Sequence, residues 1–155
     1  MACGNGPPAG THALSDLTWA WAAGGWGPVE RDRSNGEQAA GDGRTLTIGG
    51  TTYAKGLGTH AASDISYYLG AACSRLTVNV GVDDEADGTG GSVVFRVYRD
   101  GTLVADSGRI TGAEGAEPLT ADLTGGLELR LVVTDAGDGI DHDHADWAAP
   151  ELVCT

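Results

Sequence analysis

Short segments in which apolar and polar residues alternate recur through the chain, and they constrain its fold more than any other feature. Residues 75–81 place Leu76, Val78 and Val80 on one face, and residues 92–99 and 127–133 repeat the pattern. A period of two is typical of strands that bury one face. No helical period of ten residues or more lies between these segments. The pattern therefore predicts an all-β fold, an antiparallel β-sandwich.

Glycine-rich turns separate the predicted strands. Gly49-Gly50 lies between residues 45–48 and 51–53, which both read as short strands, and Asp100-Gly101 follows another strand. Two-residue hairpin loops need positive φ angles, which glycine adopts without steric cost. These pairs predict tight hairpins.

Length and charge limit the class of protein. The 155 residues correspond to about one domain. The formal net charge of −13 argues against a basic patch of the kind that binds nucleic acids or anionic membranes. No run of about 18 apolar residues predicts a membrane span. Residues 1–13 are rich in Gly and Pro and read as a linker remnant. We expect residues 14–155 to form one module of a longer secreted protein.

Three cysteines raise the question of a disulfide. Cys73 precedes the strand at 75–81 and Cys154 ends the strand at 150–154, so a bond between them would staple the last strand to the sheet. The chain-entropy model gives such a loop roughly 4 to 5 kcal/mol of stabilisation. The alternative is two small buried thiols. Cys3, in the linker, is then the free cysteine.

Two acidic clusters follow strands. Carboxylates at short, irregular spacing in Gly-rich backbone suit Ca²⁺, which takes six to eight oxygen ligands, although no EF-hand spacing is present. A solvated acidic loop with Asx turns explains either cluster equally well. The candidate calcium ligands are Asp83, Asp84, Glu85, Asp135, Asp138 and Asp141.

The tryptophans fall into two groups. Trp19 and Trp21 share parity in one strand and are expected to pack in the core. Trp26 stands between glycines, where it would present a flat apolar face. Sugars bind such faces, while Glu, Asp, Asn and His bond to their hydroxyls. Gly56 and Gly58 are expected to form a tight turn that brings His60 to the surface.

No catalytic constellation is found in the sequence. No G-x-S-x-G turn occurs, no cysteine lies in a nucleophile motif, and no carboxylate pair stands out at hydrolase spacing. His142 and His144 flank Asp143 and precede Asp146, a set that zinc could use, but no Glu or water-activating partner accompanies them. The chain is therefore expected not to be an enzyme.

Five ordered motifs resemble one known family over about residues 14–154. The chain is similar to the NPCBM family, the novel putative carbohydrate-binding modules, also called carbohydrate-binding module family 51. The motifs are Leu14-Ser15-Asp16-Leu17, Gly25-Trp26-Gly27-Pro28-Val29-Glu30-Arg31-Asp32 with Ser34-Asn35-Gly36-Glu37, Tyr53-Ala54-Lys55-Gly56-Leu57-Gly58-Thr59-His60-Ala61, Val80-Gly81-Val82-Asp83-Asp84-Glu85 and Asp143-His144-Ala145-Asp146-Trp147.

The resemblance implies a jelly-roll-like β-sandwich that binds galactose or terminal galactosides, holds Ca²⁺, and is attached to a secreted glycoside hydrolase. A catalytic glycosidase domain in the same parent chain would be its partner, and we expect a monomer. The alternative function is a structural or interface module that binds no sugar itself. The sugar-binding residues that the resemblance implies are Trp26, Glu30 and His60, followed by Tyr53, Asp146 and Trp147.

Overall fold

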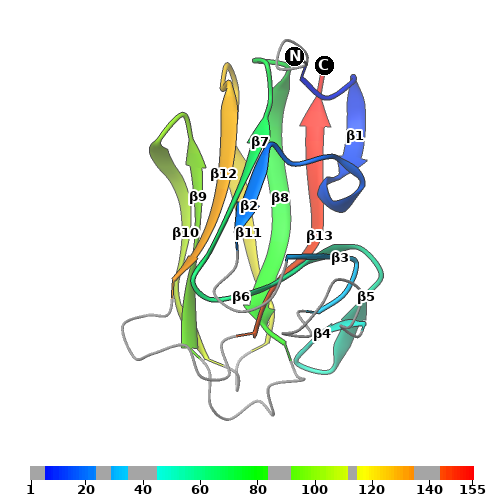
Figure 1. The fold of residues 1–155 in the computed structure, drawn as a ribbon, viewed down its shortest axis with the longest axis vertical. Helices are drawn as coiled ribbons and strands as arrows, with labels where there is room; N and C mark the ends of the chain where they lie inside the picture. The colour runs from blue at the N-terminus through cyan, green and yellow to red at the C-terminus, as the bar shows by residue number, and fades with distance from the viewer. Residues whose placement is uncertain (1–5, 24–28, 35–44, 84–91, 112–114, 135–143) are drawn as a thin grey trace.

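Two antiparallel β-sheets pack face to face around one hydrophobic core (Figure 1). The computed structural model describes residues 6–23, 29–34, 45–83, 92–111, 115–134 and 144–155. The antiparallel β-sandwich predicted from the alternating segments is confirmed. Among the described residues, no helix is long and apolar enough to cross a membrane.

The six-stranded sheet has the strand order β11-β8-β13-β6-β3, and β1 pairs with the far half of β13. Its strands are β1 (Gly10–Ala13), β3 (Glu30–Arg31), β6 (Gly56–His60), β8 (Cys73–Val82), β11 (Glu117–Asp122) and β13 (His144–Cys154).

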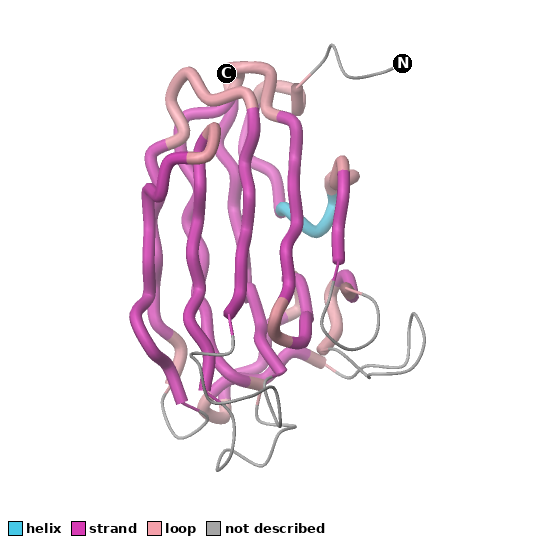
Figure 2. Tube along the Cα trace, turned by 60° about the vertical axis from the view of Figure 1, so that its left-hand side comes forward, coloured by secondary structure: helices cyan, strands magenta, loops and turns pink. Residues whose placement is uncertain are grey.

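The five-stranded sheet has the order β10-β9-β12-β7-β2, and a separate hairpin, β4-β5, accompanies the two sheets. Figure 2 shows that most strands run along the long axis of the molecule. The remaining elements are β2 (Trp21–Ala23), β4 (Leu46–Ile48), β5 (Thr51–Tyr53), β7 (Ser63–Tyr68), β9 (Ser92–Arg99), β10 (Thr102–Thr111), β12 (Glu128–Thr134) and the 3₁₀ helix η1 (Leu14–Asp16).

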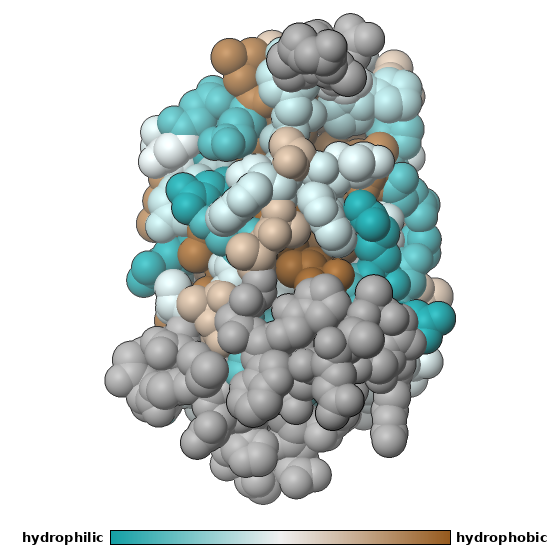
Figure 3. Space-filling view, viewed as in Figure 1, coloured by the Kyte–Doolittle hydropathy of each residue, from teal (hydrophilic) through white to brown (hydrophobic). Residues whose placement is uncertain are grey.

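The alternating residues fill the core as expected. Leu76, Val78 and Val80 of β8 are buried, and so are Phe95 of β9 and Leu131 of β12. Apolar surface removed from water contributes roughly 25 cal/mol per Å², so this layer supplies most of the driving force for folding. On the face drawn in Figure 3, hydrophilic and hydrophobic residues are interspersed.

The predicted hairpin turns form where glycine permits them. Gly49 and Gly50 have φ angles of 57° and 83°, the combination that a two-residue loop between β4 and β5 requires. Asp100 and Gly101, at 49° and 83°, join β9 to β10 in the same way.

The start of the module differs from the sequence prediction. Gly10–Ala13, assigned to a linker, form β1 and pair with β13 in antiparallel register, Gly10 opposite Cys154. Four residues with Ala13 as their one apolar side chain give too weak a pattern to be read as a strand. The ordered sheet therefore begins before residue 14.

The two ends of the six-stranded sheet differ in chemistry. At one end Cys73, which begins β8, is bonded to Cys154, which ends β13, and this is the pairing expected from the sequence. At the other end β6 stops at His60 and β13 starts at His144, and these two residues are direct partners. The disulfide and the histidines are thus at opposite ends of β13.

Candidate functional site

The outer face of the six-stranded sheet carries the polar residues that the sequence analysis singled out. Side chains of a strand alternate between its faces, and Trp147 of β13 lies in the core. Asp146 and His144 therefore lie on the outer face. The register places Glu30, Gly58, Asp146 and Gly81 side by side across β3, β6, β13 and β8.

Five titratable residues on or next to this face are buried, and we call them the polar cluster. A buried ionisable group is costly unless it is paired or hydrogen-bonded, and each of these five has further interaction partners. Among these contacts, His60 and His144 meet through their rings, and Asp83 joins them through its backbone N–H. The members of the cluster are Glu30 (5% exposed), His60 (1%), Asp83 (1%), His144 (8%) and Asp146 (0%).

Glycines in the strands make room for the elements that cover this face. A Cβ atom on Gly81 would lie 2.5 Å from Ile48 of β4, and one on Gly56 would lie 2.5 Å from Leu46. A Cβ atom on Gly58 would lie 2.1 Å from the carbonyl oxygen of Arg33. The β4-β5 hairpin and residues 33–34 therefore pack directly on the sheet backbone, with the polar cluster beside them.

The two histidines form the centre of the cluster. Their ring centroids are 5.1 Å apart in an edge-on arrangement. His60 Nδ1 lies 2.9 Å from the carbonyl oxygen of Ala61, and since a carbonyl only accepts, this nitrogen is the donor. The neutral ring then has Nε2 as an acceptor. Asp83 N donates to the His144 carbonyl at 2.8 Å, which joins β8 to the pair.

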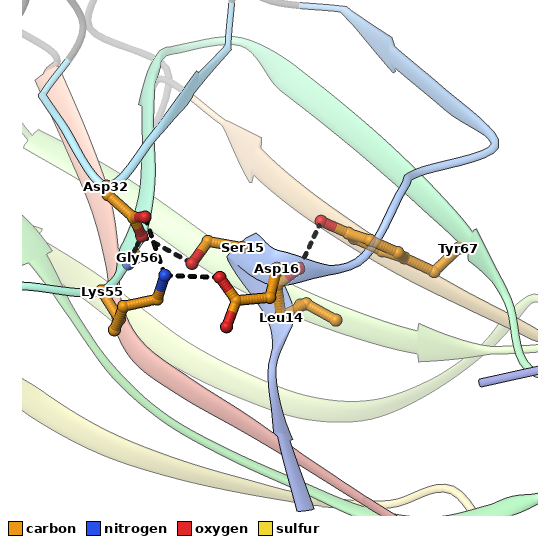
Figure 4. Close-up of polar contacts among 7 residues, drawn as sticks. All are labelled: Leu14, Ser15, Asp16, Asp32, Lys55, Gly56 and Tyr67. Carbon is orange, nitrogen blue, oxygen red and sulfur yellow. Dashed lines mark hydrogen bonds and ion pairs between the residues drawn. The ribbon is translucent and has the colours of Figure 1, made fainter. Parts of the chain in front are cut away.

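A second group of polar contacts fixes β3 beside β6, as Figure 4 shows. Asp32, at a φ angle of 61°, accepts hydrogen bonds from Ser15 Oγ at 2.6 Å and Gly56 N at 3.1 Å. Lys55 Nζ donates to Asp32 at 2.8 Å and also to Asp16. Asp32 is two residues beyond Glu30, so these contacts hold Glu30 opposite Gly58.

The hydrogen bonds between Asp32 and Lys55 and their neighbours favour the charged forms of both side chains. Burial, the largest single influence, tends to raise the pKa of the Asp32 carboxyl, but hydrogen bonds from Lys55, Ser15 and Gly56 together bring it below its usual value. Hydrogen bonds to Asp16 and Asp32 raise the pKa of the Lys55 amine. Both side chains are therefore charged at neutral pH, and the ion pair between them does not depend on pH in that range.

Several predicted site residues lie elsewhere than expected. His60 does not follow a surface turn, because Gly56–His60 is a strand whose residues are all buried. Trp147 is fully buried and packs edge-on against Phe95 at 5.0 Å, so its ring belongs to the core, a correction to its expected contact with sugar. Tyr53 is half-buried on β5. Trp21, expected in the core, is 51% exposed.

Other predictions concern residues that the structure does not describe. Trp26 lies outside the described residues, as do Asp84, Glu85, Asp135, Asp138 and Asp141 of the predicted calcium site. Asp83 is the described member of that set, and its Oδ2 accepts a hydrogen bond from Thr47 N at 3.2 Å. In the part of the chain that is described, no group of three or more His, Cys, Asp or Glu side chains is placed to hold a metal ion.

Three residues of the site were not among those predicted to bind sugar or calcium. His144 shares the parity of Asp146 in His-Ala-Asp-Trp, a period-two signal that places both on one strand face. Gly58 and Gly81 stand inside strands, where a glycine indicates that another backbone or side chain approaches closely.

Replacing Gly58 with alanine is expected to damage the site and the stability together. The added Cβ atom would overlap the backbone of residues 33–34, which must shift, at a cost of about 1–3 kcal/mol for overpacking. Chemical denaturation and sugar titration of the same variant measure both effects. Gly115→Ala is the matched control because nothing lies within 4 Å of its Cβ position. Equal stability of the two variants would contradict the close packing at Gly58.

Comparisons with known proteins agree with this architecture. Residues 10–153 match the NPCBM/NEW2 domain. A CBM51 from Clostridium perfringens GH95, solved in complex with methyl-galactose, is 37% identical, with a TM-score of 0.83 over 93% of this chain and 100% of that chain. The CBM51-2 and INT domains of Clostridium perfringens ZmpB, solved with GlcNAc, are 34% identical, with a TM-score of 0.83 over 92% of this chain and 31% of that chain.

Two curated relatives are much longer enzymes. The putative endo-alpha-N-acetylgalactosaminidase of Renibacterium salmoninarum is 41% identical over 96% of this chain and 10% of its own length. Alpha-1,3-galactosidase B of Akkermansia muciniphila is 36% identical over 66% of this chain and 13% of its own length. The chain thus spans about a tenth of each relative. The fold, the family match and these neighbours together show that the chain belongs to the NPCBM family and is a non-catalytic carbohydrate-binding module with a β-sandwich fold.

Proposed function

We propose that this module binds galactose or terminal galactosides at the end of the six-stranded sheet where His60 and His144 meet. The observation that carries the proposal is the polar cluster at this end, which combines carboxylates and imidazoles. Such groups form hydrogen bonds with sugar hydroxyls. The 37% identical neighbour that was solved with methyl-galactose supports galactose as the sugar.

The five residues of the cluster differ in exposure, and we assign them different roles accordingly. His144 is the most exposed of the five, at 8%, so the sugar would contact the cluster at this residue. Glu30 and Asp146 lie deeper and would hold the histidines in position. Trp26, which the family resemblance implies as the stacking residue, would supply the apolar face. A neutral sugar fits best, because the chain carries a net charge of −13 and repels acidic ligands.

In its parent protein the module would direct an attached, secreted glycoside hydrolase to its glycan. The long glycosidase relatives support this proposal, and so does the disulfide, which suits an oxidising compartment. Binding needs no second copy of the chain, so we expect a monomer.

We also propose a calcium ion bound through Asp83 and the predicted ligands at 84, 85, 135, 138 and 141. Carboxylate oxygens at irregular spacing are the donors that Ca²⁺ prefers. Asp83 adjoins the polar cluster through its hydrogen bond to His144. An ion there would order this end of the sheet without taking part in any reaction.

Calorimetric titration of the module with methyl-galactose tests the proposal. We expect saturable binding to methyl-galactose, none to glucose, and a loss of about tenfold or more in affinity for His144→Ala. His12→Ala is the matched control, because His12 lies on β1 at the opposite end of β13. Repeating the titration in EDTA shows whether calcium supports the site.

The opposite result is equally informative. Absence of heat with methyl-galactose at every concentration would contradict the galactoside assignment. It would instead favour a module whose buried polar cluster stabilises an interface with the neighbouring catalytic domain.

A further inference from the structure

A second surface of the module combines exposed aromatic and fixed polar groups, and it lies on the other sheet. Ile65 and Leu131 face the core, so the residues that alternate with them form the outer face of the five-stranded sheet. The register aligns five of these residues in one row across the sheet. From β2 to β10 they are Trp21, Ser66, Arg130, Tyr98 and Leu103.

The row has apolar ends and a polar middle. Trp21 is 51% exposed and Leu103 is 46% exposed, and they lie on the two edge strands. Four inter-strand steps separate them, roughly 19 Å. Trp19, two residues earlier, differs because the Arg31 guanidinium lies 3.8 Å from the centre of its ring. Of these two tryptophans, Trp21, the first residue of β2, is therefore the one that offers an open face.

The polar middle of the row is held in place. Arg130 Nε donates to both carboxylate oxygens of Asp64, at 2.7 and 2.9 Å, and a second guanidinium nitrogen contacts the same carboxylate. This ion pair raises the pKa of Arg130. Arg96 and Asp106 pair at 3.4 Å on the adjacent strands. The charges on this face are thus matched locally, although the whole chain is strongly acidic.

We propose that this row, the Trp21 row, is a second binding surface and that its ligand is a neutral, extended oligosaccharide. An exposed tryptophan stacks on a sugar ring, and a planar guanidinium and a tyrosine hydroxyl meet hydroxyls along the chain. Local charge balance favours a neutral ligand over an acidic or basic one. The inference rests on the proposed carbohydrate-binding function but uses none of the residues of the polar cluster.

The pattern suits a glycan better than a second copy of this chain. A protein interface needs an apolar core that is depleted in charged residues. Here the apolar residues are about 19 Å apart, and an ion pair lies between them. An oligosaccharide matches this arrangement because each sugar unit offers both an apolar face and hydroxyls.

The experiment compares short and long neutral ligands in amide and indole NMR titrations of the whole module. Methyl-galactose is expected to shift signals near His144, whereas a linear galactan hexasaccharide should also shift the Trp21 indole and the backbone of Ser66 and Tyr98. Trp21→Ala should weaken hexasaccharide binding about tenfold and leave methyl-galactose binding unchanged. Leu127→Ala, which removes a 52% exposed apolar side chain elsewhere, is the matched control.

Each alternative result has a distinct meaning. Hexasaccharide shifts confined to the His144 end, or equal affinity for Trp21→Ala and the unmodified module, would overturn the second surface and leave the galactoside site standing. Shifts at Trp21 without any near His144 would support the second surface and contradict the proposed galactoside site. A dimer in sedimentation that Trp21→Ala abolishes would assign the row to a second copy and overturn the glycan inference.

Discussion

Replacing Cys73 and Cys154 together with alanine is expected to lower the free energy of unfolding by about 2–5 kcal/mol. The bond closes a loop with a sequence separation of 81 and joins the start of β8 to the end of β13. Opening it restores conformational freedom to the unfolded chain, and the folded chain also loses a link between its two most extensive paired strands. Urea denaturation of the variant and of the unmodified module measures the difference.

The position of the disulfide also predicts what does not change. The polar cluster lies at the opposite end of β13, so sugar affinity should be retained at temperatures where the double variant is folded. Cys3→Ala keeps the disulfide and is the control. A reducing agent should bring the unmodified module to the stability of the double variant and leave that variant unaffected. Unchanged stability of the double variant would contradict a structural role for the bond.

Strands with one buried face could be predicted because burial leaves a direct trace in the sequence. Residues 92–99 place Val93, Phe95 and Val97 on one face, and β9 has the same bounds. The Gly49-Gly50 turn was equally clear, because its geometry requires positive φ angles that few other residues adopt. The alternation of a strand is periodic along the sequence, and the φ angles of a turn depend on its own residues. The sequence alone could therefore reveal the sandwich.

The candidate site was harder to predict because both faces of its strand β6 are covered by other parts of the chain. β6 carries Gly-Leu-Gly-Thr-His, in which glycines on the outer face make the alternation look like a turn. Those glycines are needed because the chain at 33–34 and the β4-β5 hairpin pack on top. Only the tertiary structure shows these neighbours. His60 was therefore expected at the surface, and it lies in a buried layer.

The last strand is longer than its sequence pattern predicts. β13 was expected to start near residue 150, but it starts at His144. Ala149, with a φ angle of 49°, interrupts the ladder between Ala148 and Glu151, so the alternation breaks in the middle of the strand. This irregularity separates the half that pairs with β6 from the half that pairs with β1. Local period alone could not join the two halves.

Trp147 and Asp146 are neighbours in the sequence, but substitutions at Trp147 are expected to reduce stability, whereas a substitution at Asp146 is expected to reduce sugar binding. Trp147→Ala should lower the free energy of unfolding by about 3–5 kcal/mol, because the side chain is fully buried and contacts Phe95. Within the described part of the chain, Trp147 Nε1 has no hydrogen-bond partner. Trp147→Phe therefore loses volume but no hydrogen bond, and it should cost much less than the alanine variant.

Denaturation and titration of three variants separate the core from the site. If Trp147 belongs to the core, Trp147→Phe binds methyl-galactose with nearly the affinity of the unmodified module, since phenylalanine keeps an apolar ring between the sheets. Asp146→Asn, on the outer face, keeps the size of the side chain but replaces a carboxyl oxygen with an amide group, and it should weaken binding. Loss of binding in Trp147→Phe with unchanged stability would instead mean that the indole itself contacts the sugar. Alternation along β13 predicts the first result, because consecutive side chains of a strand cannot face the core and the site at once.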